Sequence, residues 1–194
     1  MQAFIVYAHP SENSFTRQIR DSFIMGLESS GRRYIVSDLY KMQFKTDMSE
    51  AEYLREACYR RDAPVPDDVA AEQAKINSSG AIVFIYPVFW SDVPAKLAGW
   101  FDRVWTYGFA YGENRTMKQL EKGLCLCSAG NTMEYLHKTG LLESMQRVML
   151  KDRLFDRAKV KEMIVLDGTS RELESRKANW DSHLRRAFEA GAAL

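Results

Sequence analysis

The sequence predicts an α/β fold in which helices cover a five-stranded parallel sheet. Five short apolar runs alternate with longer amphipathic stretches, and this alternation is typical of parallel sheets. The first and third runs are nearly continuous in Val, Ile, Phe and Tyr, as expected of strands buried on both faces. The 194 residues contain no internal repeat or Gly/Ser linker, so we expect a single domain over 1–194. The five runs span residues 3–8, 34–39, 81–86, 123–128 and 161–166.

Capping residues mark a first helix and an inserted one. Asn13 and Ser14 precede apolar residues that recur every four positions, which predicts a helix. Ser49 and Glu52 have the spacing of a capping box and predict a further helix over roughly 50–61. These signals place one helix after the first strand and another after the second.

Three more helices complete the alternation. Two aspartates at the start of residues 65–77 favour the positive end of a helix dipole. Pro94 is expected in the first turn of the next helix. Thr169 with Glu172 again has capping-box spacing, which predicts the start of the last helix.

This element order favours one topology. Right-handed crossovers leave few arrangements, and the order 2-1-3-4-5 of a flavodoxin-like three-layer sandwich suits the length of the chain. The switch point of that order lies between strands one and three, and ligands bind beyond the carboxyl ends of the strands there. Functional residues are therefore expected after positions 8, 86 and 128.

The first of these loops offers a helix start without a glycine-rich nucleotide motif. Neither G-x-G-x-x-G nor G-x-x-x-x-G-K-S/T occurs there. Hydroxyl and amide side chains stand at the helix start instead, where free backbone N–H groups favour a phosphate. Simple capping by Asn13 or Ser14 is the alternative, and the loop alone does not decide between the two.

The second loop is stiff and aromatic. Pro87 and Pro94 bracket the large side chains of Phe89 and Trp90. A planar ring system such as isoalloxazine can rest against such a loop and accept hydrogen bonds from its backbone. In isolation, the two aromatic side chains could equally complete the core under the loop.

The third loop combines a glycine with hydrogen-bonding aromatic side chains. Gly130 permits close approach of the backbone, and Tyr135 and His137 follow it. A single Tyr or His on a helix is usually structural. These two become candidates because the topology places them at the switch point.

The helix after Pro94 and its sequel are unusually rich in aromatic residues. A core stripe accounts for Phe101, but the remainder exceed what one helix face needs. Contact with a partner subunit or a hydrophobic substrate pocket is the favoured interpretation. The six residues are Trp100, Phe101, Trp105, Tyr107, Phe109 and Tyr111.

Composition excludes several classes of function. The net charge of +1 argues against a field that captures nucleic acid or anionic membranes. The three histidines lie far from the cysteines, so no zinc-binding pattern is present, and Cys125 and Cys127 are expected to be small buried hydrophobes. A basic leader and a long apolar stretch are both lacking, which predicts a cytoplasmic protein without membrane insertion.

Two segments resemble a known family. Residues 86–104 read YPVFWSDVPAKLAGWFDRV and residues 108–112 read GFAYG. This long ungapped stretch is similar to the NAD(P)H:quinone oxidoreductases of the flavodoxin-like superfamily, which include general stress proteins and potassium-efflux ancillary reductases. The opening residues 8–15 resemble the phosphate loop of the same family.

The resemblance implies a role for each matched residue. One group would hold the flavin phosphate, a second would line the isoalloxazine ring, and a third would pack on its other edge. A Tyr would hydrogen-bond near the pyrimidine ring, a His is a weaker catalytic candidate, and two aromatic residues would close the substrate pocket across a dimer interface. In that order the residues are His9, Ser14, Phe15 and Thr16; Pro87, Val88, Phe89 and Trp90; Ser128, Ala129 and Gly130; Tyr135; His137; Phe109 and Tyr111.

The implied activity is electron transfer from NAD(P)H to a quinone or similar small acceptor by a ping-pong mechanism. The resemblance also implies a homodimer with bound flavin. The chain ends soon after its fifth helix, without the C-terminal extension of larger FAD-binding members, which favours FMN over FAD. The alternative function is that of an ancillary flavoprotein subunit of a membrane transporter, with residues 105–111 as the exposed partner surface.

Overall fold

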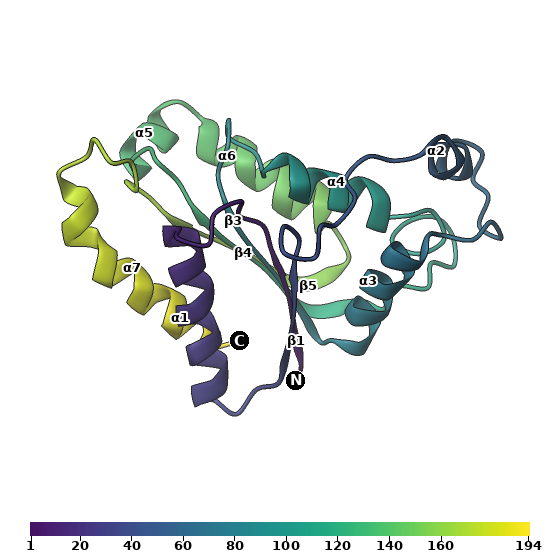
Figure 1. The fold of residues 1–194 in the computed structure, drawn as a ribbon, viewed down its shortest axis with the longest axis horizontal. Coiled ribbons are helices and arrows are strands. Elements are labelled where there is room, and N and C mark those ends of the chain that lie inside the picture. The colour runs from purple at the N-terminus through teal and green to yellow at the C-terminus, as the bar shows by residue number, and fades with distance from the viewer.

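A single five-stranded parallel sheet forms the centre of the molecule, in the order β2-β1-β3-β4-β5 (Figure 1). The computed structural model describes residues 1–194, apart from the side chain of Ser175. The predicted flavodoxin-like topology is confirmed. The strands are β1 (Ala3–Tyr7), β2 (Tyr34–Asp38), β3 (Ala81–Pro87), β4 (Leu120–Ser128) and β5 (Ala158–Leu166).

The burial of each strand follows from its place in the sheet. Every residue of β1 and β3 is buried, because both strands are central and covered on two faces. The edge strands β2 and β5 keep partly exposed residues. Apolar side chains of β1 alternate between two cores: Phe4 and Val6 enter one, and Ile5 enters the other.

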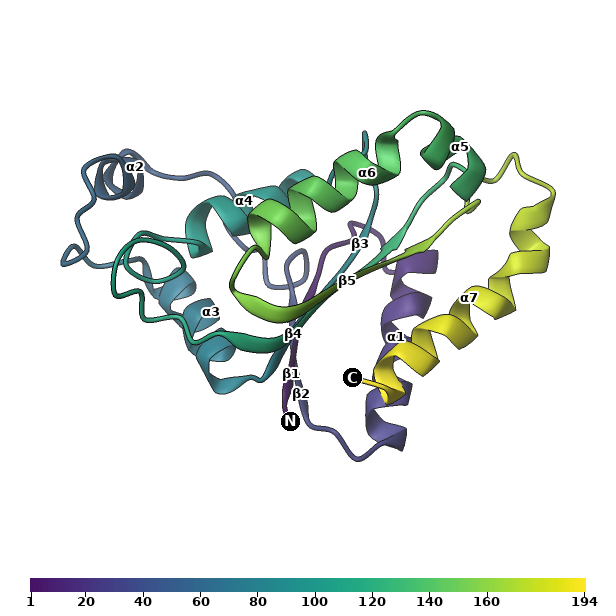
Figure 2. The same cartoon turned by 180° about the vertical axis from the view of Figure 1, so that it is seen from behind.

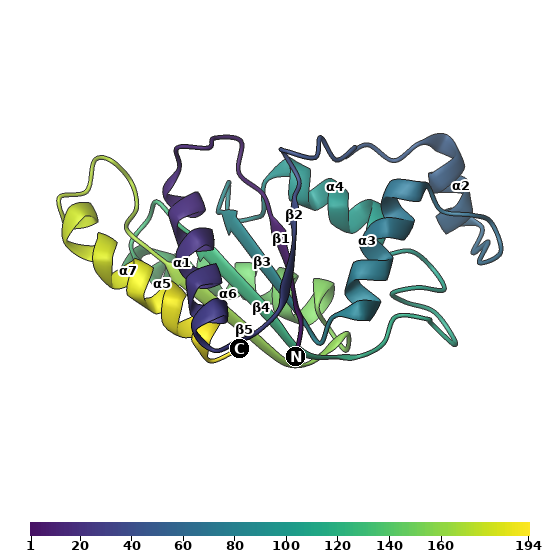
Figure 3. The same cartoon turned by 60° about the horizontal axis from the view of Figure 1, so that its bottom comes forward.

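Helices cover the two faces of the sheet unequally (Figures 2 and 3). One face is covered by α1 (Phe15–Ser29) and α7 (Ser175–Ala192). The other carries α3 (Asp67–Ser78), α4 (Ala95–Val104), α5 (Met133–Lys138), α6 (Leu141–Gln146) and the π-helix η1 (Arg147–Arg153). The inserted α2 (Glu50–Ala57) lies beyond α3 and α4 in all three views. Among the described residues, no helix is both long and apolar enough to cross a membrane.

Most capping predictions are confirmed, and one is wrong. Ser14 is the N-cap of α1, and the Ser49–Glu52 capping box opens α2, which ends at Ala57 rather than at 61. The box predicted at Thr169 and Glu172 does not form, because α7 begins only at Ser175. The Thr169 hydroxyl instead donates to the carbonyl of Ala129, at 2.9 Å, and so fastens the loop after β4.

A buried arginine fastens α2 and α3 to α4. Arg103 donates to Glu52 at 2.7 Å and to Asp68 at 2.6 Å. The Arg103 hydrogen bond holds the pKa of Asp68 below its ordinary value. Burial raises the pKa of Glu52, but hydrogen bonds from Ser49 and Arg103 outweigh it and lower that pKa overall. Both acids therefore remain ionised partners of Arg103 at neutral pH.

Glycines allow α1 and α7 to touch through their backbones. A Cβ atom at Gly26 would lie 2.0 Å from the carbonyl oxygen of Phe188. A Cβ atom at Gly191 would lie 2.1 Å from the carbonyl oxygen of Phe23. The close contact fixes α1, and with it the helix start that follows β1.

We therefore expect Gly26→Ala to destabilise the protein. Alanine favours a helix by about 1 kcal/mol over glycine, but its methyl group must push the two helices apart, at a cost of about 1–3 kcal/mol. Urea denaturation should show a net loss, whereas Met25→Ala, at an exposed neighbouring position, should change stability by less than about 0.5 kcal/mol. Equal stability of the two variants would contradict this packing.

Candidate functional site at the ends of three strands

Three loops meet at the carboxyl ends of β1, β3 and β4. The backbone N–H of Val88 donates to the carbonyl of Ser128 at 2.8 Å, which joins the loops after β3 and β4. The hydroxyls of Thr16 and Ser128 hydrogen-bond at 2.9 Å in a buried position, which joins the start of α1 to the same strand end. These contacts make the three predicted loop sites one continuous surface.

The start of α1 is suited to an anion. The Ser14 hydroxyl accepts from the N–H of Arg17 at 3.1 Å and caps the helix. Within the described part of the chain, the N–H groups of Ser14, Phe15 and Thr16 donate no hydrogen bond. Free N–H groups and the positive end of the helix dipole attract a phosphate. Capping and anion binding, posed as alternatives by the sequence, are therefore compatible here.

His9 lies beside this helix start and is neutral at neutral pH. Burial lowers the pKa of His9, and a hydrogen bond with the backbone of Ser11 opposes that shift only in part. The N–H of Ser11 donates to His9 Nδ1 at 2.9 Å. His9 Nδ1 also lies 3.1 Å from the carbonyl oxygen of Ser11, so the backbone of Ser11 holds the ring by this nitrogen in either neutral tautomer.

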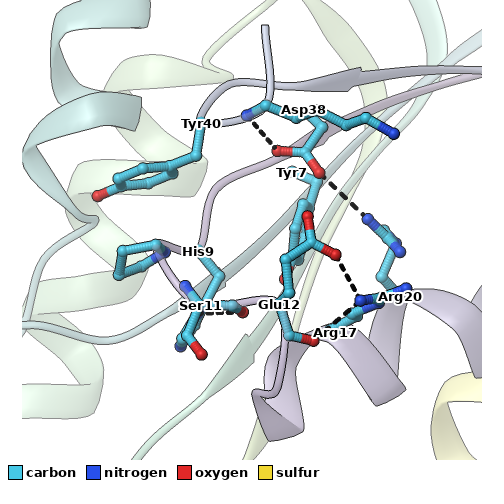
Figure 4. Close-up of a pocket in the computed structure, with 10 residues that line it drawn as sticks. Tyr7, His9, Ser11, Glu12, Arg17, Arg20, Asp38 and Tyr40 are labelled. Carbon is cyan, nitrogen blue, oxygen red and sulfur yellow. Dashed lines mark hydrogen bonds and ion pairs between the residues drawn. The ribbon is translucent and has the colours of Figure 1, made fainter. Parts of the chain in front are cut away.

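A cavity of about 260 Å³ adjoins His9 on the β2 side (Figure 4). Two ion pairs lie in its wall, Arg17 with Glu12 and Arg20 with Asp38. Of the residues predicted to contact a flavin, His9 alone lines it. The cavity thus lies next to the β1–β3 switch point, not at it. The lining is Tyr7, His9, Pro10, Ser11, Glu12, Arg17, Arg20, Asp38, Tyr40 and Lys41.

The loop after β3 forms a two-residue hairpin. Phe89 and Asp92 exchange backbone hydrogen bonds of 2.9 and 3.0 Å, and Trp90 and Ser91 form the turn between them. The Trp90 side chain is fully exposed, and Phe89 is exposed as well. In the part of the chain that the structure describes, the N–H groups of Trp90 and Ser91 have no acceptor. The hairpin therefore exposes an aromatic ring and two free N–H donors, and these features suit the binding of a planar ligand.

The loop after β4 exposes its backbone at Gly130. The N–H of Ala129 donates to Leu166 at 3.0 Å, which fixes the loop against β5. A Cβ atom at Gly130 would meet nothing closer than the Cβ of Ser170, at 3.8 Å. The protein itself would thus tolerate a side chain at 130, and the open backbone there is left to a ligand.

Tyr135 and His137 both lie on α5 but face different ways. They are two residues apart, which separates them by about 200° around a helix. Tyr135 is exposed, and Nδ1 of His137 lies 3.3 Å from Oε1 of Glu143. The structure therefore does not bring the two catalytic candidates together, and Tyr135 remains the freer hydrogen-bond donor.

Phe109 and Tyr111 lie away from the three loops within this chain. They follow the C-terminal end of α4, about 15 Å along that helix from the hairpin. Phe109 is buried, and the Tyr111 hydroxyl donates to Glu56 at 2.8 Å. Desolvation and this bond raise the pKa of Tyr111. Within one chain, these two residues therefore do not line the surface formed by the three loops.

Half of the aromatic segment is core: Trp100, Phe101 and Phe109 are buried, whereas Trp105, Tyr107 and Tyr111 are partly exposed. Trp100 is fully buried and packs edge-on against Phe84, Phe101 and Trp105. The Trp105 indole N–H donates to the carbonyl of Arg153 at 2.7 Å. The surplus of aromatic residues fills the space between β3, α4 and η1, an arrangement that periodicity along one helix does not reveal.

Sequence reasoning missed one ion pair at the site. Asp92 of the hairpin pairs with Arg153 at the end of η1, with 2.7 Å between Oδ1 and Nη1. The two residues are 61 positions apart, and no local pattern links them.

Comparison with known proteins identifies the family of the chain. Residues 1–189 match the family model described as Flavodoxin-like fold. The chain belongs to this family. An NAD(P)H:quinone oxidoreductase from Methanothermobacter marburgensis is 45% identical and superposes with a TM-score of 0.94, covering 100% of this chain and 96% of that one.

Curated relatives of this flavodoxin-like chain include quinone-linked enzymes. A ribosyldihydronicotinamide dehydrogenase (quinone) from Pongo abelii is 31% identical over 157 residues, which cover 72% of this chain and 68% of that protein. An NAD(P)H dehydrogenase (quinone) 1 from Cavia porcellus is 32% identical over 123 residues, 57% of this chain and 45% of that protein. The chain spans about half the length of several curated relatives that it matches. The resemblance of residues 86–104 to this family is confirmed.

We expect Thr16→Val to loosen the joint between the loops. The substitution keeps the side-chain volume but leaves the buried Ser128 hydroxyl without its partner, at a cost of about 1–3 kcal/mol. Thr139→Val is the matched control, because its hydroxyl is exposed and bonds only within its own turn. The free energy of unfolding of both variants is measured by chemical denaturation. An equal loss in the two variants would contradict the proposed link between the loops.

Proposed function

We propose that the protein is a flavin-dependent oxidoreductase that passes electrons from NAD(P)H to a quinone or a similar small acceptor. The observation that carries the proposal is the joining of three loops into one surface with free N–H donors at the α1 start and at the hairpin. Similarity to quinone oxidoreductases over nearly the whole chain supports the same function.

The flavin phosphate fits the start of α1. Its charge would meet the free N–H groups of Ser14, Phe15 and Thr16, with the Ser14 hydroxyl beside them. The lowered pKa keeps the His9 ring neutral, and in the tautomer with its proton on Nε2 the ring would donate a hydrogen bond to the phosphate. FMN is our proposed flavin and FAD the alternative; both carry a phosphate suited to this helix start.

The isoalloxazine ring fits between the hairpin and the β4 loop. Residues 87–90 would line one edge, with the free N–H groups of Trp90 and Ser91 as donors. Residues 128–130 would approach the other edge through their backbone. When bound, the flavin takes two electrons from a nicotinamide and passes them to the acceptor.

The side chains of this chain would orient ligands and stabilise charge. The Tyr135 hydroxyl is exposed and would donate toward the negative charge that develops on the ring, with His137 as a secondary candidate. Donor and acceptor would use the exposed face beside Trp90 in turn, which is a ping-pong scheme. In a homodimer, Phe109 and Tyr111 of the partner subunit would close that face against water.

An anaerobic visible spectrum tests the proposal directly. The flavin-supplemented protein should bleach on addition of NADPH or NADH and regain its colour with menadione. Chromatography of the released flavin distinguishes FMN from FAD, and light scattering measures the oligomeric state. A chain that binds neither flavin, or that binds one without bleaching, would contradict the proposed enzyme.

A further inference from the structure

The hairpin that would receive the flavin is strained. Trp90 and Ser91 have φ angles of 52° and 62°, in the left-handed region that residues other than glycine rarely adopt. Tight hairpins of this kind usually carry Asn or Gly at these two positions. Strained backbone persists only where surrounding contacts hold it, and it gathers at functional sites.

Packing of the two aromatic side chains of the hairpin supplies little of that support. The side chain of Trp90 is fully exposed and that of Phe89 is nearly half exposed, so neither is held by the core. Before the hairpin, Val88 is tied to Ser128. At its other end, Val93 is buried in the core, and Asp92 within the hairpin pairs with Arg153.

Arg153 is held in place independently of the hairpin. Its carbonyl accepts from the indole of Trp105, its guanidinium lies 4.8 Å from the centre of the Phe101 ring, and Nη1 lies 3.4 Å from the sulfur of Met149. It is the last residue of the π-helix η1, a helix type that often occurs at functional sites. These contacts fix the guanidinium of Arg153, and the carboxylate of Asp92 in the hairpin pairs with it.

The carboxylate of Asp92 links this cation to the turn. Asp92 Oδ1 accepts from Arg153 Nη1 at 2.7 Å and from the N–H of Val93 at 2.7 Å. The second carboxylate oxygen lies 3.5 Å from Arg153 Nη2. The space beneath the hairpin is too narrow for a water molecule, and it is lined by Tyr86, Ser91, Asp92, Met145 and Met149.

We propose that Arg153 is a positioning residue of the flavin site, which acts by holding Asp92 and so keeping the strained hairpin in its ligand-ready form. The inference rests on the proposed flavin function. When the hairpin is already ordered, no binding energy is lost in ordering it. The apparent affinity for the ligand is proportional to the fraction of molecules whose hairpin is ordered, so it falls when that fraction falls.

The test is Arg153→Gln, with two measurements on the apoprotein. Hydrogen exchange at the amides of Phe89 and Asp92 should be about tenfold faster than in the unmodified protein, and the Kd for FMN, from fluorescence quenching, should rise about tenfold. The matched control is Arg115→Gln, which removes an ion pair with Asp156 that does not touch the hairpin. Side-chain exposures are 17% and 47% for the Arg153 pair, and 23% and 48% for the control pair.

A rescue separates positioning from general stability. Glycine adopts positive φ without strain, so Ser91→Gly in the Arg153→Gln background should restore most of the lost protection and affinity. Arg153→Lys should retain part of the exchange protection and part of the affinity for FMN. If Arg153→Gln does not fold, Asp92→Asn makes the same test from the more exposed partner.

The outcomes are distinct. The role of Arg153 would be overturned if the folded Arg153→Gln variant had the amide exchange rates and the Kd for FMN of the unmodified protein. It would also be overturned if Ser91→Gly restored neither quantity. Failure of the unmodified chain to bind FMN would defeat the proposed function, while the exchange measurement would still decide whether Arg153 holds the hairpin.

Discussion

The parallel pairing of β1, β3 and β4 is the constraint on which the rest of the site depends. Because the three strands run in one direction, their following loops leave the same edge of the sheet. Because β1 and β3 are completely buried, their backbone groups must pair with neighbouring strands, β1 with β2 and β3, and β3 with β1 and β4, and this pairing fixes the register. Hydrogen bonds at Thr16, Val88 and Ser128 extend this order into the loops.

Local chemistry then determines what each loop can bind. The loop after β1 ends in a helix start, which supplies free N–H groups and a positive dipole end. The loop after β3 is a strained hairpin with an exposed Trp90, held at Asp92 by Arg153. A negative group and a planar ring are therefore favoured at adjacent places on one surface, and a flavin nucleotide combines the two.

The sequence predicts most of the fold because its signals are local. Continuous apolar runs identify the strands, and Ser14 and the Ser49–Glu52 box identify two helix starts. The same spacing misleads at Thr169, where a tertiary bond to Ala129 competes with capping. At the site, loop positions follow from topology, but the Asp92–Arg153 pair joins elements 61 residues apart and leaves no pattern along the chain. The burial of Trp100 leaves no local pattern for a similar reason, since its ring packs against Phe84 of β3 as well as against Phe101 and Trp105.

A crystal structure of the protein with bound FMN tests the central claim most directly. We expect the phosphate on the N–H groups of Ser14, Phe15 and Thr16, and the ring between the hairpin of residues 89–92 and the backbone of residues 128–130. FMN in the cavity between β1 and β2, or anywhere else away from the three joined loops, would contradict the account.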